Sequence, residues 1–202
     1  MASWTIEYRR VGDAGGGWPG SFLDVGAAAD TLRGMAKTAP LDLDRVYAGG
    51  HSAGGHLALW LAARGKLAPD SALYAPSPLR IRGVLGLAAI TDLESYRIGP
   101  ADSCNAAVDQ LMGGDPQTYP ARYAQASPRR LLPLGVPQVF IQGGRDPIVD
   151  PASVQSYVAA ARKAGDPATE LLLPQSGHFE AAVPYAPTEL AFREALRRLL
   201  EH

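Results

Sequence analysis

One short segment of the chain has the spacing of a nucleophilic serine. Residues 50–54 read Gly-His-Ser-Ala-Gly, with Ser52 at the centre. A β-like run, residues 45–48, precedes this segment, and an apolar helix-like run, residues 57–63, follows it. In a G-x-S-x-G turn between a strand and a helix, the serine sits on strained backbone, and the flanking glycines let strand and helix approach closely. The segment therefore predicts a nucleophilic serine that accepts an acyl group and transfers it to water.

A serine hydroxyl is a weak nucleophile, so the sequence must also supply a base and an acid that orients the base. In parallel α/β sheets such groups lie on loops beyond the carboxyl ends of strands. Of the four histidines, His178 alone directly follows a predicted strand. His51 adjoins the serine, His56 lies in the predicted helix and His202 is terminal, which makes each a poorer base. We expect His178 to be the base.

Three aspartates follow predicted strands and could orient the base. Asp146 follows the strand predicted over residues 138–142, Asp150 lies four residues further on, and Asp92 follows another strand. We prefer Asp146, because Ser52, Asp146 and His178 then have the order of nucleophile, acid and base in α/β-hydrolases. Asp92 and Asp150 are expected to cap helices or tie loops.

Strand-like and helix-like runs alternate along the chain, which predicts an α/β class with a mostly parallel sheet between helices, in three layers. We expect about five strands, over residues 4–10, 46–50, 84–90, 138–142 and 169–173. We expect helices over residues 22–37, 54–64, 106–112, 151–164 and 187–200. Residues 94–135 are less regular and are the natural place for a cap. With no repeat or linker, residues 1–202 should form a single domain.

The composition of the chain argues against several classes of function. The chain has 202 residues and a formal net charge of −1, with no Lys/Arg run that would suggest nucleic acid. Its one cysteine, Cys104, excludes an internal disulfide and lies in a polar stretch unlike a nucleophile site. No apolar run is long enough to span a membrane, and the N-terminal residues do not resemble a signal peptide. We therefore expect a cytoplasmic location.

Together these motifs resemble the α/β-hydrolase superfamily, and within it the small carboxylesterases related to bacterial kynurenine formamidase and to acetyl and feruloyl esterases. The resemblance covers nearly the whole chain and rests on residues 6–10, 15–19, 50–56, 126–128, 136–137, 143–146 and 177–179. It implies a triad of Ser52, His178 and Asp146, no metal or cofactor, and hydrolysis of a small ester or amide. An aryl formamidase acting on N-formylkynurenine and a non-catalytic protein of the same fold remain alternatives.

The sequence departs from this family at its start. In such relatives a His-Gly-Gly loop precedes the strand matching residues 6–10 and donates oxyanion N–H groups. Here the chain begins at that strand, so we expect a sheet truncated at its N-terminal side. We expect the N–H of Ala53 to remain an oxyanion donor, and the loop at residues 15–18 to be the local substitute for the second if the first strand has shifted. Because losing one donor costs roughly 10²–10³ in rate, we expect a weak or promiscuous esterase.

The same departure leaves a gap in the expected sheet. In the family's strand order, the missing third strand lies between the strands matching residues 4–10 and 46–50. Three outcomes follow. Residues 4–10 pair directly with residues 46–50, a second copy of the chain covers the open edge as a homodimer, or the chain is a fragment with a compromised fold.

Overall fold

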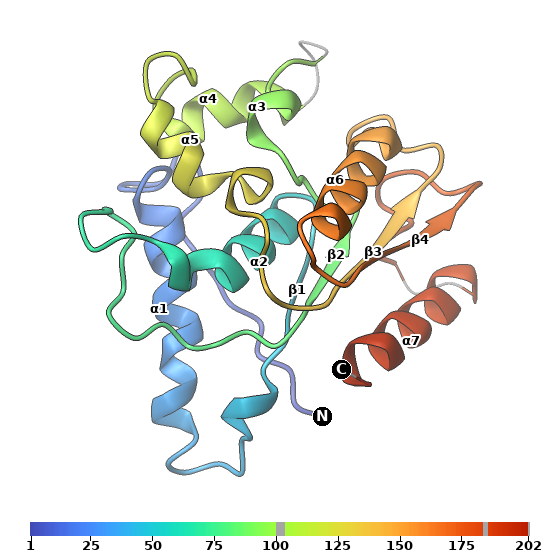
Figure 1. Ribbon diagram of the computed structural model, residues 1–202, viewed down its shortest axis with the longest axis horizontal. Coiled ribbons are helices and arrows are strands. Elements are labelled where there is room, and N and C mark those ends of the chain that lie inside the picture. The colour runs from blue at the N-terminus through green and yellow to red at the C-terminus, as the bar shows by residue number, and fades with distance from the viewer. Residues whose placement is uncertain (100–103, 184–185, 202) are drawn as a thin grey trace.

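The computed structural model describes residues 1–99, 104–183 and 186–201 (Figure 1). At its centre is a four-stranded parallel sheet with the spatial order β1-β2-β3-β4. The strands are β1 (Ala48–His51), β2 (Val84–Leu87), β3 (Gln138–Gly143) and β4 (Ala168–Leu173). A helix lies in each connection between them, as parallel strands require. The sheet confirms the predicted α/β class and places four of the predicted strands within a few residues of their expected bounds.

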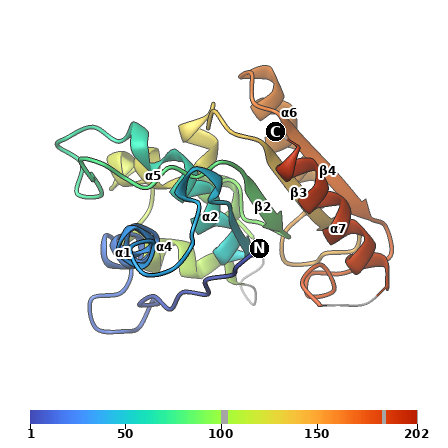
Figure 2. The same cartoon turned by 90° about the horizontal axis from the view of Figure 1, so that it is seen from below.

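Helices cover both faces of this sheet. They are α1 (Gly20–Met35), α2 (Ala53–Ala63), α3 (Leu93–Tyr96), α4 (Ala107–Met112), α5 (Pro120–Ala126), α6 (Pro151–Lys163) and α7 (Ala186–Leu200). Short 3₁₀ turns occupy Leu43–Arg45, Arg64–Lys66, Cys104–Ala106 and Pro128–Leu131. One face carries α2 against β1 and β2, and α6 against β3 and β4, while α7 packs on the other face (Figures 1 and 2). This is the predicted three-layer arrangement.

Burial follows from these layers. All six residues of β3 are buried, because β3 lies inside the sheet and both of its faces carry helices. The larger core cluster includes Phe22, Leu59 and Trp60 on the α2 side of the sheet. A smaller cluster joins Ile141 of β3 to Leu199 of α7. The two clusters hold the carboxyl ends of the strands in fixed relative positions.

The prediction of a first strand over residues 4–10 is wrong. This segment has no regular secondary structure and runs past the sheet toward α1 (Figure 1). Ile6 and Tyr8 pack partly against the core. The Arg9 guanidinium forms two hydrogen bonds with the Asp24 carboxylate of α1, at 2.7 and 2.8 Å. These contacts hold the segment against α1, so the direct pairing with β1 is also wrong, and the described sheet has four strands rather than five.

The outer edge of β1 is consequently unpaired within the described residues. The N–H groups of Ala48 and Ser52 donate to carbonyl groups on the β2 side, at 3.1 and 2.9 Å. Backbone groups of successive residues in a strand point to opposite sides, so those of Gly49 and His51 face away from β2. Gly49 is exposed to solvent. An exposed strand edge of this kind is a template for pairing with another chain.

We expect a second copy of the chain to cover this edge. Light scattering over a range of concentrations should then give the mass of two chains. A Gly49→Lys variant should shift the mass toward one chain, because a lysine on the edge opposes strand pairing. Gly34→Lys is the matched control, since Gly34 is an exposed glycine of α1 with open space around it. A wild-type protein that stays strictly monomeric at high concentration would contradict the prediction.

Candidate active site

Ser52 lies on a sharp turn between β1 and α2. Its backbone has φ 55° and ψ −117°, a conformation that non-glycine residues rarely adopt. Its carbonyl accepts hydrogen bonds from the N–H groups of His56 and Ile90, at 3.1 and 3.3 Å. Its own N–H donates to the carbonyl of Leu87 at 2.9 Å. The surroundings hold the strained turn in place, as functional strain requires, and its geometry is the one that the motif spacing predicts.

Two glycines make this turn possible by removing steric overlap. A Cβ on Gly50 would lie 2.3 Å from the carbonyl carbon of Gly54, and one on Gly55 would lie 2.5 Å from the Cβ of Ala89. A Cβ on Gly54 would meet nothing within 4 Å. The close packing around this turn therefore depends on Gly50, which belongs to the motif, and on Gly55, which follows it, rather than on Gly54.

The structure brings together Asp146 and His178, which are 32 residues apart in the sequence. His178 Nδ1 lies 2.8 Å from Asp146 Oδ2, and the two side chains are 4% and 0% exposed. The other carboxylate oxygen accepts the N–H groups of Ile148 and Val149 at 2.8 and 2.9 Å. Burial raises the pKa of Asp146, but the hydrogen bonds from His178 and from these N–H groups outweigh burial and hold this pKa below its usual value. An ionised Asp146 keeps the proton of His178 on Nδ1 and leaves Nε2 able to accept one.

Ser52 follows a strand at the opposite end of the sheet from the strand before His178. It follows β1 and His178 follows β4, so both lie at the carboxyl edge of the sheet. In the described part of the chain no hydrogen bond joins the Ser52 hydroxyl to His178. Such bonds are often long until substrate binds. The three predicted residues thus follow strands that end at one edge of the sheet, and Asp146 and His178 are already hydrogen-bonded to each other.

His51 is the site residue that sequence reasoning missed. Its Nε2 lies 3.0 Å from the backbone carbonyl of His178, and its ring centroid lies 4.5 Å from that of His178. Since a carbonyl can only accept, His51 Nε2 carries a proton and donates it. Burial lowers the pKa of His51, while its hydrogen bond to the carbonyl acts in the opposite direction. In the sequence, His51 is marked by its position next to Ser52. That position argues against His51 as the base and does not predict its contact with His178.

The other two aspartates considered as the acid cap helices. Asp150 caps α6 by accepting the N–H of Ala152 at 2.9 Å, and Asp92 caps α3 by accepting the N–H of Glu94 at 3.0 Å. These contacts confirm the predicted capping roles. Cys104 is an exposed free thiol. His202 lies outside the described residues. In the described part of the chain, no three His, Cys, Asp or Glu side chains gather closely enough to hold a metal ion.

The N–H of Ala53 is free to serve as the predicted oxyanion donor, whereas three N–H groups of the expected substitute are engaged elsewhere. The N–H of Ala53, at the start of α2, has no acceptor among the described residues, and the positive end of the helix dipole adds to its field. In the loop at residues 15–18, the N–H groups of Gly16, Gly17 and Trp18 already donate to other groups, at 2.9, 2.9 and 2.7 Å. For these three N–H groups the prediction of a substitute donor is wrong.

Comparison with known proteins fits this geometry. The sequence model of the BD-FAE family matches residues 1–160. The chain belongs to the BD-FAE family. This family comprises α/β-hydrolase-type esterases. No curated protein matches the sequence. In the described parts of this BD-FAE chain, no helix is long and apolar enough to cross a membrane.

Several solved structures share the fold. A truncated carbohydrate esterase from gut microbiota has a TM-score of 0.78 at 21% identity, and the match covers 98% of this chain and 72% of that one. A bifunctional GH43-CE protein of Bacteroides eggerthii has a TM-score of 0.73 at 22% identity, with 94% and 29% covered. Butyrate-bound esterase 2 of Thermogutta terrifontis has a TM-score of 0.71 at 19% identity, with 96% and 68% covered. The BD-FAE chain thus spans less than a third of the bifunctional protein and about 70% of the other two.

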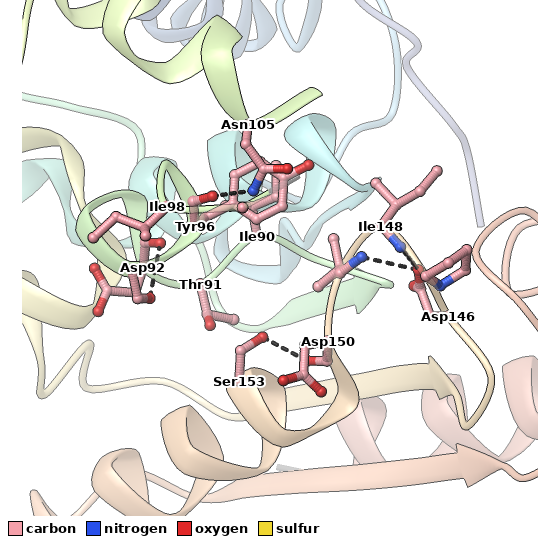
Figure 3. Close-up of a pocket in the computed structure, with 14 residues that line it drawn as sticks. Ile90, Thr91, Asp92, Tyr96, Ile98, Asn105, Asp146, Ile148, Asp150 and Ser153 are labelled. Carbon is pink, nitrogen blue, oxygen red and sulfur yellow. Dashed lines mark hydrogen bonds between the residues drawn. The ribbon is translucent and has the colours of Figure 1, made fainter. Parts of the chain in front are cut away.

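A pocket of about 310 Å³ opens beside Asp146, between the loops that follow β2 and β3 (Figure 3). The N–H of Ile90, in its wall, donates to the Ser52 carbonyl, although Ser52 and His178 are not among the described lining residues. Asp92 and Asp150 place carboxylates in the wall, and the described lining residues include no lysine or arginine. The Tyr96 hydroxyl, from the predicted cap, is buried without a hydrogen-bond partner in the described residues. Burial, with smaller effects of Cys104 and Asp146, raises the pKa of Tyr96 to about 12, so this hydroxyl stays a neutral donor.

Proposed function

We propose that this BD-FAE chain is a serine esterase that hydrolyses small carboxylic esters through an acyl-enzyme. One observation carries the proposal. The buried Asp146–His178 pair lies at the same sheet edge as Ser52, whose backbone is held at a positive φ. A base oriented by a buried carboxylate, next to a serine on a strained strand-to-helix turn, is the arrangement that acyl transfer needs.

The chemistry follows from these groups. Ser52 Oγ attacks the ester carbonyl carbon while His178 Nε2 takes the hydroxyl proton, and Asp146 stabilises the resulting imidazolium. The tetrahedral intermediate places its negative oxygen near the Ala53 N–H and the start of α2. When the intermediate collapses, the alcohol leaves with the proton from His178. Water then attacks the acyl-enzyme with His178 as base, which releases the acid and restores Ser52.

The reaction is expected to be slow for an esterase. The N–H groups of Gly16, Gly17 and Trp18 are engaged elsewhere, so with Ala53 as its donor the oxyanion has less stabilisation than a pair of donors gives. Loss of one donor costs roughly 10²–10³ in rate. This supports the prediction of a weak or promiscuous enzyme.

The pocket favours an ester of a neutral, hydroxyl-bearing alcohol. The carboxylates of Asp92 and Asp150 can accept hydrogen bonds from alcohol groups. The same carboxylates oppose a substrate anion, because the described lining offers no cation to pair with it. A neutral ester meets no such repulsion, whereas N-formylkynurenine carries both an α-carboxylate that these groups oppose and an α-ammonium that they attract. The carbohydrate-esterase function named for one structural neighbour supports the same direction.

Labelling with a fluorophosphonate probe tests the proposal. We expect one probe molecule per chain, with the modified peptide containing Ser52 when it is mapped by mass spectrometry. Esterase 2 of Thermogutta terrifontis, phosphonylated by sarin, shows such a reaction in a protein of this fold. Hydrolysis of p-nitrophenyl acetate should exceed that of N-formylkynurenine. A folded chain that neither reacts with the probe nor hydrolyses either substrate would favour the non-catalytic alternative.

A further inference from the structure

The contact between His51 and His178 links the two outer strands of the sheet. His51 ends β1 and His178 follows β4, and these strands stand at opposite ends of the order β1-β2-β3-β4. Neighbouring strands lie about 4.8 Å apart, so three spacings separate β1 from β4 by about 14 Å. The loop after β4 therefore reaches back across the carboxyl edge to place the two rings 4.5 Å apart.

Asp146 holds the His178 ring at Nδ1, and other hydrogen bonds hold the loop before it. The N–H of Arg145 donates to the Ser176 carbonyl at 2.9 Å, that of Ser176 to the Leu173 carbonyl at 3.1 Å, and that of Gly177 to the Glu180 carboxylate at 3.1 Å. None of these contacts involves the backbone of His178 itself. A ring held at one nitrogen can still change direction when its own backbone shifts. The hydrogen bond from His51 Nε2 to the His178 carbonyl fixes that backbone at 3.0 Å.

We propose that His51 is a positioning residue that sets the direction of His178 Nε2 relative to the nucleophile. His51 immediately precedes Ser52 in the chain, so anchoring His178 to His51 also fixes the base with respect to the serine hydroxyl. His51 acts as a neutral donor through Nε2–H, and its ring packs against that of His178. It acts through His178 and has no direct part in bond breaking. This inference rests on the proposed esterase function.

Two substitutions separate the hydrogen bond from the packing. His51→Phe keeps a ring beside His178 and removes the donor, whereas His51→Gln keeps an amide N–H at similar reach and removes the ring. We expect kcat for p-nitrophenyl acetate to fall about 10- to 100-fold in His51→Phe, since a misplaced base slows the chemical step, with KM within about twofold of wild type. His51→Gln should stay within about threefold of wild type. The rate of fluorophosphonate labelling should follow kcat in both variants.

The measurements include thermal unfolding of each variant, and His51→Leu serves as a second donor-free variant if His51→Phe does not fold. A wild-type chain without activity would overturn the proposed function. An active wild type with an equally active, folded His51→Phe would overturn the role of His51 alone. Equal losses in His51→Gln and His51→Phe, or a loss that falls on KM rather than kcat, would also overturn it.

Discussion

Replacing Ser52 with alanine is expected to lower kcat for p-nitrophenyl acetate by about 10⁴- to 10⁶-fold, to the rate left by binding and the oxyanion donor alone. Without the hydroxyl there is no nucleophile for His178 to activate and no acyl-enzyme. The turn itself should survive. The Ser52 side chain makes no hydrogen bond within the described residues, and alanine meets the same positive φ as serine. The variant therefore separates loss of chemistry from loss of fold.

The measurement combines steady-state rates, fluorophosphonate labelling and thermal unfolding. Labelling should disappear in Ser52→Ala, while the Tm stays within a few degrees of wild type. Ser77→Ala is the matched control, because Ser77 is exposed and lies outside the candidate site. Activity that persists in purified Ser52→Ala at the level of wild type would show that another group of the protein is the nucleophile.

Lowering the pH from 7 to 4 is expected to reduce the free energy of unfolding by about 3 kcal/mol through His56 alone. His56 is 2% exposed within α2, and its Nε2 donates to the Ala126 carbonyl at 2.9 Å. Burial lowers its pKa to about 4, against the weaker opposing effect of that hydrogen bond. Between pH 6.5 and 4 the unfolded chain therefore binds a proton at His56 that the folded chain does not. Stability from this group is complete above pH 6.5, declines as the pH falls to 4 and changes little below that.

Urea unfolding at several pH values between 7 and 4 measures this effect. His56→Gln is the matched variant, because glutamine can donate to the Ala126 carbonyl but does not titrate. Its free energy of unfolding should decline by about 3 kcal/mol less than that of wild type over this range. The same decline in both proteins would show that the pH dependence comes from other groups.

Most elements could be predicted from the sequence because their signals are local. The strands β2 and β3 are predicted by short runs of apolar residues. The helices α1 and α6 are predicted by helical periodicity. Both patterns depend on residues that are close together in the sequence. The segment at residues 4–10 shows the limit of such signals. It alternates apolar and polar residues as a strand does, but a strand needs a partner, and the bidentate Arg9–Asp24 contact attaches this segment to α1 instead.

In the candidate site, too, some features could be predicted from local signals and others could not. Ser52, Asp146 and His178 each follow a predicted strand, so the rule that parallel strands end at one edge places all three at that edge. The contact of His51 with a carbonyl 127 residues away has no local signal. Nor does the close approach of Gly55 to Ala89, which depends on how far α2 lies from the segment after β2.

The unpaired edge of β1 also determines how the site can be lost. Ser52 follows β1 and His178 follows β4, the two strands that are hydrogen-bonded on a single side in the described sheet, whereas Asp146 follows β3, which is paired on both sides. Local opening takes place where few backbone hydrogen bonds must break. Ser52 and His178 therefore both follow the less protected strands of the described sheet, and heating should separate the two residues before the sheet as a whole melts.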